Sequence, residues 1–286
     1  MELAAIGEAL SKLDYLDSSY LSLDGFIIPM NSNTIKLASK IESNSSKINA
    51  IADVFYGIKV YEEGKGKPPQ TRDIVNNKPF TSDRKKSKEW LPFYDGKDIT
   101  RFKILWKGQN WIHYGPWVAA PRNPKNFEGE KLLIRKIVGK TLFATFFAST
   151  SYCNTLVYVL KIFKESEINY LNLLGIINSY IIGWYIRSKL QISHDDIFPQ
   201  IMKEDILSLP ISRDVKKRDS IRNLTKEIIK RAENGHETLH LEAQLDALIA
   251  HAYGLTEEEY TLILNDLKLE DSIRSACLKE YNRIEK

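Results

Sequence analysis

The stretch that decides the fold is LLIRKIVGKTLFATFFA, residues 132–148. Two apolar runs, Leu132 to Val138 and Leu142 to Ala148, are separated by Gly139 and Lys140. Apolar runs of about seven residues that are rich in aromatic and branched side chains are typical of strands, and glycine favours the connection between them. The stretch therefore predicts two strands of a mixed β-sheet, hinged at Gly139-Lys140.

Strand signals extend to both sides of this pair. Thr155 to Leu160 predicts a further strand, and Ile51 to Tyr61 is rich in β-favouring residues. The latter run ends at EEGKGKPP, residues 62–69. Because proline blocks both helices and central strands, this segment predicts a turn.

Helical signals begin near Ser166, a candidate N-cap, and continue at helical spacing to about Leu190. After Pro210 the pattern is helical throughout, with a break expected at Asn234-Gly235. Thr256 and Glu259 match a capping box, which predicts the start of a last helix. The apolar stripes of the two preceding helices comprise Ile221, Leu224 and Ile228, and then Leu241, Leu245, Leu248 and Ala252.

These signals predict an α+β chain in three parts. Residues 1–50 form a lead-in segment, residues 51–212 a domain built on a mixed β-sheet, and residues 213–286 a helical hairpin. A chain of 286 residues is long enough to bury a core without metals or disulfides.

Composition points to a soluble cytoplasmic protein. Of the residues, 43% are hydrophobic and 27% charged, and the cysteines, Cys153 and Cys277, have no metal-binding or disulfide spacing. The acidic start, Met1 to Glu8, lacks the positive charge of a secretory signal. The most apolar run, Leu171 to Ile186, is shorter than the ~20 residues that a membrane span needs. It predicts a buried helix.

Positive charge is concentrated in two segments. The net charge is +9 over residues 51–150 and +5 over residues 211–232, although the whole chain carries only +4. Residues 233–286 are acidic, with a net charge of −7. A segregated field of this kind suits a polyanionic partner, and a merely solvated basic surface is the alternative.

His236, Glu237 and His240 match the HExxH zinc pattern, in which one helical face holds both imidazoles and the glutamate acts as general base. The helix break expected at Asn234-Gly235 places this motif at a frayed first turn. We interpret the histidines as exposed residues at a helix start, with no metal site and no cofactor in this chain.

Asp53, Glu63 and Lys65 weakly match the acidic pair and lysine of a magnesium-dependent nuclease. Glu63 and Lys65 fall in the predicted turn and not on a strand, which argues against that site. Gly64-Lys65-Gly66 precedes prolines, so it predicts no dinucleotide or S-adenosylmethionine cradle. The sequence also lacks the Asn/Asp-Pro-Pro-aromatic motif with which amino-methyltransferases hold a flipped base. We therefore expect no catalytic site.

An ordered series of short motifs runs from Gly57 to Ile211. It starts with Gly57-Ile58-Lys59 and the turn at 64–69, and continues with Tyr94-Asp95-Gly96-Lys97-Asp98-Ile99-Thr100-Arg101-Phe102, Trp111–Trp117, Pro121-Arg122, Phe127, Lys131–Ile137, Leu174–Ser179, Phe198–Ile201 and Leu209–Ile211. This order resembles the TaqI-like C-terminal specificity domain of adenine-specific DNA methyltransferases and of fused type IIG restriction–modification enzymes.

The resemblance implies a target-recognition domain over residues 51–212. Such a module binds double-stranded DNA and selects the sequence at which a methyltransferase catalytic domain or subunit acts. S-adenosylmethionine would then be bound by that catalytic partner and not by this chain.

The composition of the +9 segment also favours DNA binding, because cationic and aromatic side chains are interspersed along it. Lysine and arginine neutralise phosphates and grip base edges, and aromatic groups pack against bases and sugars. At least half of the aromatics, Trp106 and Trp184 among them, are expected in the core. The candidate DNA-binding residues are Lys65, Lys67, Arg84, Lys85, Lys86, Lys88, Arg122, Lys125, Arg135, Lys136 and Lys140.

The terminal helices allow two interpretations. An antiparallel pair, basic on its first arm and acidic on its second, could serve as a spacer that docks the catalytic domain, or could only stabilise the core. For the whole chain, the alternatives to DNA recognition are the magnesium-dependent nuclease and a scaffold whose basic segment meets an acidic protein.

Overall fold

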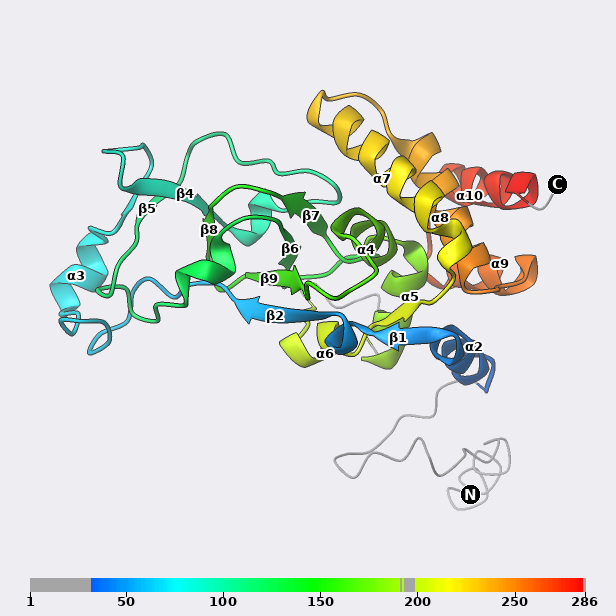
Figure 1. Ribbon diagram of the computed structural model, residues 1–286, viewed down its shortest axis with the longest axis horizontal. Helices are drawn as coiled ribbons and strands as arrows, with labels where there is room; N and C mark the ends of the chain where they lie inside the picture. The colour runs from blue at the N-terminus through cyan, green and yellow to red at the C-terminus, as the bar shows by residue number, and fades with distance from the viewer. Residues whose placement is uncertain (1–31, 191, 193–198, 285–286) are drawn as a thin grey trace, which may run out of the picture.

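The computed structural model describes residues 32–190, 192 and 199–284. The lead-in segment up to residue 31 lies outside these ranges, as does Phe198 of the motif series. The molecule is elongated, with a small sheet at one end, a larger sheet in the middle and helices at the other end (Figure 1). This α+β architecture confirms the predicted fold class.

The larger sheet has the strand order β2-β9-β6-β7, and all of its strands pair antiparallel. The quoted stretch supplies β6 (Lys131–Arg135) and β7 (Ala144–Phe147), which pair as expected. Both strands are shorter than predicted. Residues 136–143 form a wide connection in which Val138 and Leu142 turn into the core. The neighbouring strands are β9 (Val157–Ile162) and β2 (Ala52–Tyr56).

Both faces of this sheet are buried, in two different cores. Leu132 and Ile134 lie in the first core, and Leu133 between them lies in the second. On β9, Tyr158 and Leu160 join the first core, and Val159 joins the second. Because successive side chains of a strand point to opposite faces, a continuous apolar run is what such a wall between two cores requires.

The smaller sheet has the order β3-β5-β4-β8. It consists of β3 (Thr81–Ser82), β5 (Trp111–His113), β4 (Trp90–Tyr94) and β8 (Tyr152–Cys153). These strands are too short to carry a clear periodic signal, so their pairing was not predicted. A two-stranded ribbon of β1 (Ser45–Lys47) and β10 (Pro210–Ser212) lies beside α2 (Ser32–Ser43). There are also two short helices, α3 (Arg72–Asn77) and α6 (Lys203–Leu207), and α6 packs against β2.

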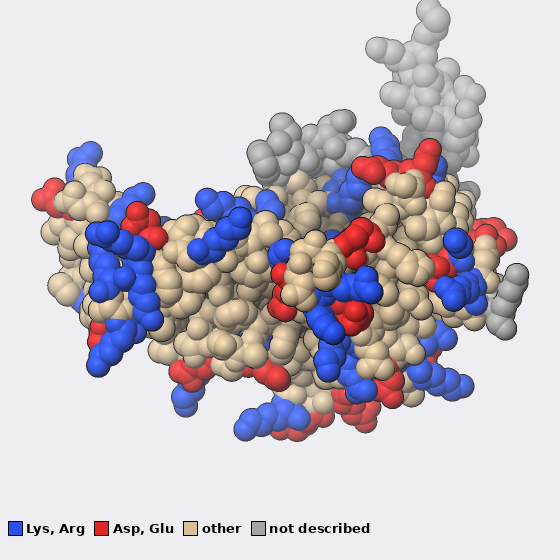
Figure 2. Space-filling view, turned by 90° about the horizontal axis from the view of Figure 1, so that it is seen from above, with Lys and Arg blue, Asp and Glu red and all other residues tan. Residues whose placement is uncertain are grey.

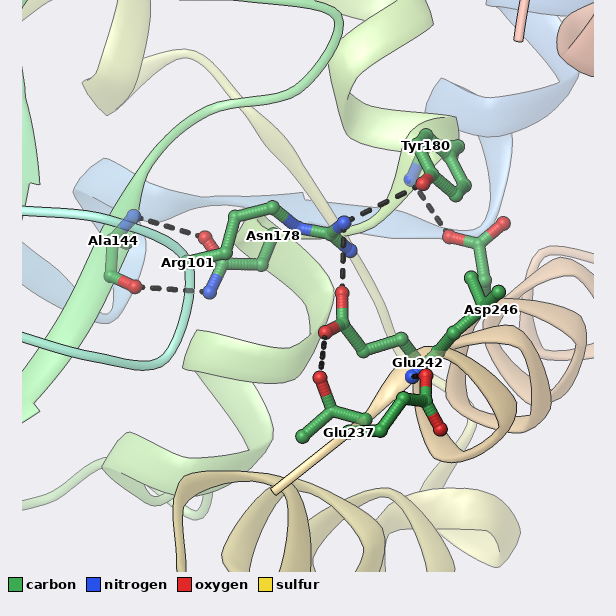
Figure 3. Close-up of polar contacts among 9 residues, drawn as sticks. Arg101, Ala144, Asn178, Tyr180, Glu237, Glu242 and Asp246 are labelled. Atoms are coloured by element: carbon green, nitrogen blue, oxygen red, sulfur yellow. Dashed lines mark hydrogen bonds and ion pairs between the residues drawn. The ribbon is translucent and has the colours of Figure 1, made fainter. Parts of the chain in front are cut away.

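The single helix predicted over residues 166–190 is wrong, because the structure has two. α4 (Tyr170–Ile177) and α5 (Tyr180–Lys189) are separated at Asn178-Ser179. The Asn178 side chain donates to Ala144 O (3.0 Å) and accepts from Ala144 N (2.9 Å), so it completes the pairing of β7 at the sheet edge (Figure 3). Ser179 then caps α5 by accepting from Ile182 N.

The C-terminal region contains four helices: α7 (Arg218–Glu233), α8 (Leu239–Ala252), α9 (Glu257–Asp266) and α10 (Asp271–Ile284). The predicted break at Asn234-Gly235 and the capping box of Thr256 with Glu259 are both confirmed. The last helix, α10, was not expected. No helix within the described ranges is long and apolar enough to cross a membrane.

These helices share the first core with the larger sheet. That core contains Leu132 of β6 and Ile181 of α5 together with Leu245, Ile263 and Tyr281 of the C-terminal helices. Gly175 lies against α7, where an added Cβ would approach Thr225 Oγ1 to 2.5 Å. A separate spacer would need its own core, so this packing favours the second interpretation of the terminal helices, stabilisation of the domain. The boundary at residue 212 remains a prediction.

A buried polar network also connects the segment around Arg101 to helices α5 and α8. Arg101 Nη1 lies 2.8 Å from Glu242 Oε2 on α8 and 3.5 Å from the Tyr180 hydroxyl (Figure 3). Asp246, one turn further along α8, accepts from Tyr180 N and from the Tyr260 hydroxyl, each at 2.7 Å. Burial raises the pKa of Asp246 to about 6, although these two hydrogen bonds and the charge of Arg101 act in the opposite direction.

The raised pKa of Asp246 predicts a pH-dependent stability. Its folded pKa lies above the unfolded value, so between about pH 4 and 6 the folded protein binds more protons than the unfolded chain. This carboxyl therefore lowers the free energy of unfolding as pH rises through that window, by about 2–3 kcal/mol. We expect Asp246→Asn to flatten the dependence in urea denaturation at pH 4, 5, 6 and 7. Exposed Asp219→Asn is the control, and an Asp246→Asn profile parallel to the wild type would contradict the assignment.

Candidate nucleic-acid interface

One face of the smaller sheet points away from both cores. Because Trp90 pairs with His113 and Pro92 with Trp111, these four side chains lie on the same side of β4 and β5. The intervening residues, Leu91, Phe93 and Ile112, pack toward the second core instead. We call the surface formed by Trp90, Pro92, Trp111 and His113 the outer face.

Aromatic rings continue from the outer face around the edge of the sheet. The Trp90 ring stacks on His113 at 5.7 Å between centroids, and His113 lies 4.7 Å from Trp117. Trp117 in turn lies 6.1 Å from Phe80, which stacks on Tyr61 at 5.8 Å. A side-chain hydrogen bond fixes Trp117 in this row, because its indole N–H donates to His113 O at 2.9 Å.

The basic loop, residues 83–89, crosses the outer face between β3 and β4. Lys86 Nζ lies 4.8 Å from the Trp90 ring centre, and Lys85 Nζ lies 5.5 Å from that of Trp111. All residues of the loop are exposed. Exposed cation–π contacts contribute only about 0.5–1 kcal/mol each, so these ammonium groups can exchange a ring for a phosphate at small cost.

The turn that carries Lys65 and Lys67 contacts the aromatic row at Trp117. Lys67 N donates to Pro116 O at 2.9 Å, and Gln70 Nε2 donates to Trp117 O at 2.8 Å. Gly66 has φ +89°, and an added Cβ would lie 2.5 Å from Trp117 O, so the close approach requires glycine. The structure thus brings the basic loop and the turn with Lys65 and Lys67, which are separate in the sequence, to one aromatic row.

A third loop, residues 103–110, borders the outer face and was not identified from the sequence. The Trp106 ring packs edge-on against Trp111 at 5.1 Å, and Leu105 is 45% exposed. Trp106 is half-buried against the second core, whereas Trp184 is fully in the first, as expected. Lys103 and Lys107 could have been found by the same reasoning, since both lie in the +9 segment beside aromatic residues.

The remaining candidate residues lie apart from the outer face. Arg122 stacks over Tyr56 at 5.9 Å, and Lys125 is exposed in the short helix Pro124–Phe127. Arg135 stacks over Phe143 at 5.2 Å, and Lys136 takes part in the backbone link between Leu156 and Ile201. The Lys140 ammonium donates to Lys268 O at the end of α9, so it helps to hold the helices.

The charge distribution also differs between the end of the molecule that carries the smaller sheet and the helical end. Figure 2 shows lysine and arginine side chains in a band across the end of the molecule that carries β4, β5 and α3, at the left of the view. At the helical end of the same view, basic and acidic side chains are intermingled. The end with the outer face is therefore the better candidate for a polyanion.

The structure does not bring together the residues of either catalytic alternative, the HExxH zinc site or the magnesium-dependent nuclease site. His236 and Glu237 precede α8, which begins at Leu239, so HExxH does not form one helical face. Asp53 forms an ion pair with Lys203 at 3.2 Å, and Glu63 and Lys65 are exposed in the turn. Within the described ranges, no group of three His, Cys, Asp or Glu side chains could hold a metal ion.

Comparison with known proteins finds a match to one family over part of the chain. Residues 91–211 match the TaqI-like C-terminal specificity domain, which confirms the resemblance over that range, although the motifs from Gly57 to Pro69 lie outside it. A proposed type II restriction enzyme and methyltransferase of Methanocaldococcus jannaschii is 28% identical over 230 residues. The match covers 75% of this chain but only 19% of that relative.

Solved structures of restriction–modification proteins are also similar. The HsdS subunit of Thermoanaerobacter tengcongensis is 11% identical with a TM-score of 0.38, covering 77% of this chain and 50% of that one. The type IIL enzyme MmeI in complex with DNA (12%, TM-score 0.45) covers 84% and 37%, and the type IIG endonuclease BpuSI (12%, TM-score 0.48) covers 90% and 34%. At TM-scores below 0.5 these similarities alone establish no shared fold.

The contacts of the basic loop predict how little it contributes to stability. We expect Lys85→Met and Lys86→Met each to lower the free energy of unfolding by no more than about 1 kcal/mol in urea denaturation. Lys131→Met is the contrasting control, because that buried ammonium donates to Gly129 O and Ser149 O, and we expect a decrease of about 1–3 kcal/mol. Decreases at Lys85 and Lys86 as large as that at Lys131 would show that the loop lysines are structural.

Proposed function

Because residues 91–211 match the TaqI-like C-terminal specificity domain, we propose that the chain recognises a sequence in duplex DNA for a restriction–modification enzyme. The observation that carries the proposal is the outer face, where the lysines of an exposed loop rest on tryptophan rings. Phosphate contacts from the loop would position the duplex, and polar and aromatic groups beside it would read the bases.

We further propose that the chain has no catalytic site and acts with a methyltransferase catalytic domain or subunit in the cytoplasm. That partner would bind S-adenosylmethionine and modify adenine. The curated relative supports this arrangement, because it is described as both a restriction enzyme and a methyltransferase and is several times longer than the matched region. Residues of this chain would select the site, and chemistry would be carried out elsewhere.

A contact between the outer face and phosphates predicts a specific salt dependence. We expect a variant with Arg84, Lys85, Lys86 and Lys88 all changed to Gln to bind duplex DNA more weakly. The slope of log affinity against log salt should become shallower by about 0.9 for each phosphate that the variant no longer neutralises. Fluorescence anisotropy at several salt concentrations measures both quantities.

The matched control carries four Gln substitutions at exposed lysines outside the +9 segment: Lys36, Lys47, Lys164 and Lys279. This control removes the same charge, so it should keep most of the slope. Equal slopes for the two variants would rule out the outer face as the phosphate-binding surface. Absence of duplex binding by the wild type at low salt would favour the scaffold.

The absence of catalysis is tested with magnesium and supercoiled plasmid. We expect no nicking by the purified chain, because Asp53 is occupied by Lys203 and is not assembled with Glu63 and Lys65. Magnesium-dependent nicking that disappears in Asp53→Ala would revive the nuclease. Nicking that persists in Asp53→Ala and co-elutes with the chain would also contradict the proposal, because another site in the chain would then be catalytic.

A further inference from the structure

A tight hairpin, residues 98–106, lies between the two cores. Ile99 and Ile104 pair across it, Thr100 N donates to Lys103 O at 3.0 Å, and Leu105 N donates to Asp98 O at 2.8 Å. Its tip is Arg101-Phe102. The base of the hairpin belongs to the second core through Ile99, whereas Phe102 at the tip is buried in the first.

The tip is held in an unfavourable backbone conformation. Phe102 has φ +61°, a region that non-glycine residues with bulky side chains rarely adopt. Its ring is 1% exposed, and Phe102 N donates to Ala144 O on β7 at 2.9 Å. Such a conformation persists only where the surroundings determine it, so the tip is fixed by its contacts and not by local preference.

Arg101 holds the tip of the hairpin through polar contacts. Besides its ion pair with Glu242, the guanidinium lies over the Tyr180 ring at 5.1 Å. Only 18% of the Arg101 side chain and 19% of the Glu242 side chain are exposed. Glu242 is held in turn by the Thr238 hydroxyl, which donates to it at 2.6 Å. Figure 3 shows these side chains converging from the sheet region, α5 and α8.

The other end of the hairpin continues into the loop that borders the outer face. Trp106 packs against Trp111 of the outer face and edge-on against Tyr94 at 5.6 Å. Asp98 accepts from Gln109 Nε2 at 3.0 Å, which closes the loop 103–110 on the hairpin. One short element thus connects α8 to the rim of the proposed DNA-binding surface.

We propose that Arg101 is a positioning residue, which fixes the loop 103–110 against the outer face by anchoring the hairpin to α8 and so sets the sequence discrimination of the module. The proposal rests on the proposed function. Arg101 itself is too far inside the protein, between Glu242 and Tyr180, to contact a phosphate. Its replacement is therefore expected to affect discrimination between sequences and not the electrostatic part of DNA binding.

The test compares Arg101→Met and Glu242→Gln with Lys203→Met, which removes a different partly buried ion pair, remote from the hairpin. A duplex selected from a randomised pool with the wild type serves as the preferred sequence, and a scrambled duplex as the competitor. We expect both hairpin variants to reduce the affinity ratio of the two duplexes about tenfold, a change typical of a single mismatched base pair. The salt slope should stay unchanged, and Lys203→Met should keep the wild-type ratio.

Hydrogen exchange of the free protein provides a second readout. We expect the hydrogen-bonded amides of Thr100 and Leu105 to exchange at least about tenfold faster in Arg101→Met at matched global stability, with no such change in Lys203→Met. An unchanged affinity ratio together with unchanged exchange would overturn the proposal. If the wild type binds no duplex, the proposed function fails, whereas the exchange experiment still tests the anchoring of the loop.

Discussion

The structure depends on one constraint, the burial of both faces of the larger sheet. Alternate residues of β6 and β9 enter two different cores, so this sheet is the wall that separates them. On the side of the first core, α4 packs against β6 and β7, and the C-terminal helices pack in turn on α4 and α5, whereas the smaller sheet covers the other face. The outer face exists because the smaller sheet uses only its inner side for the second core, which leaves Trp111 and His113 on the opposite side of β5.

Sequence reasoning succeeded where the physical signal was strong and local. The apolar run at 132–148 predicted the pair of β6 and β7, and glycine and capping signals predicted where the C-terminal helices end and begin. It failed where a tertiary contact overrides helical periodicity, as at Asn178, whose side chain completes the edge of β7. The strands of the smaller sheet have between two and five residues, too few for a periodic pattern, and their register depends on partners far away in the sequence.

The candidate site was predictable in composition but not in arrangement. The +9 segment contains the outer face, yet its net charge does not distinguish exposed Lys86 from Lys140, whose ammonium donates to Lys268 O after α9. Lys131 is a clear example of the difficulty: burial lowers its pKa to about 8, and its ammonium serves two backbone carbonyls. Only the fold shows which cations are free for a ligand. Similarly, Arg101 belongs to the motif at residues 94–102, but its ion-pair partner Glu242 lies 141 positions away and could not be inferred from the spacing of residues in the sequence.

The most direct test of the central claim is the structure of the protein bound to a selected duplex. The account predicts phosphates within hydrogen-bonding distance of the ammonium groups of Lys85 and Lys86, which leave the tryptophan rings, and the duplex running along the outer face. A duplex seated on the helical end, with the basic loop still resting on Trp90 and Trp111, would contradict it.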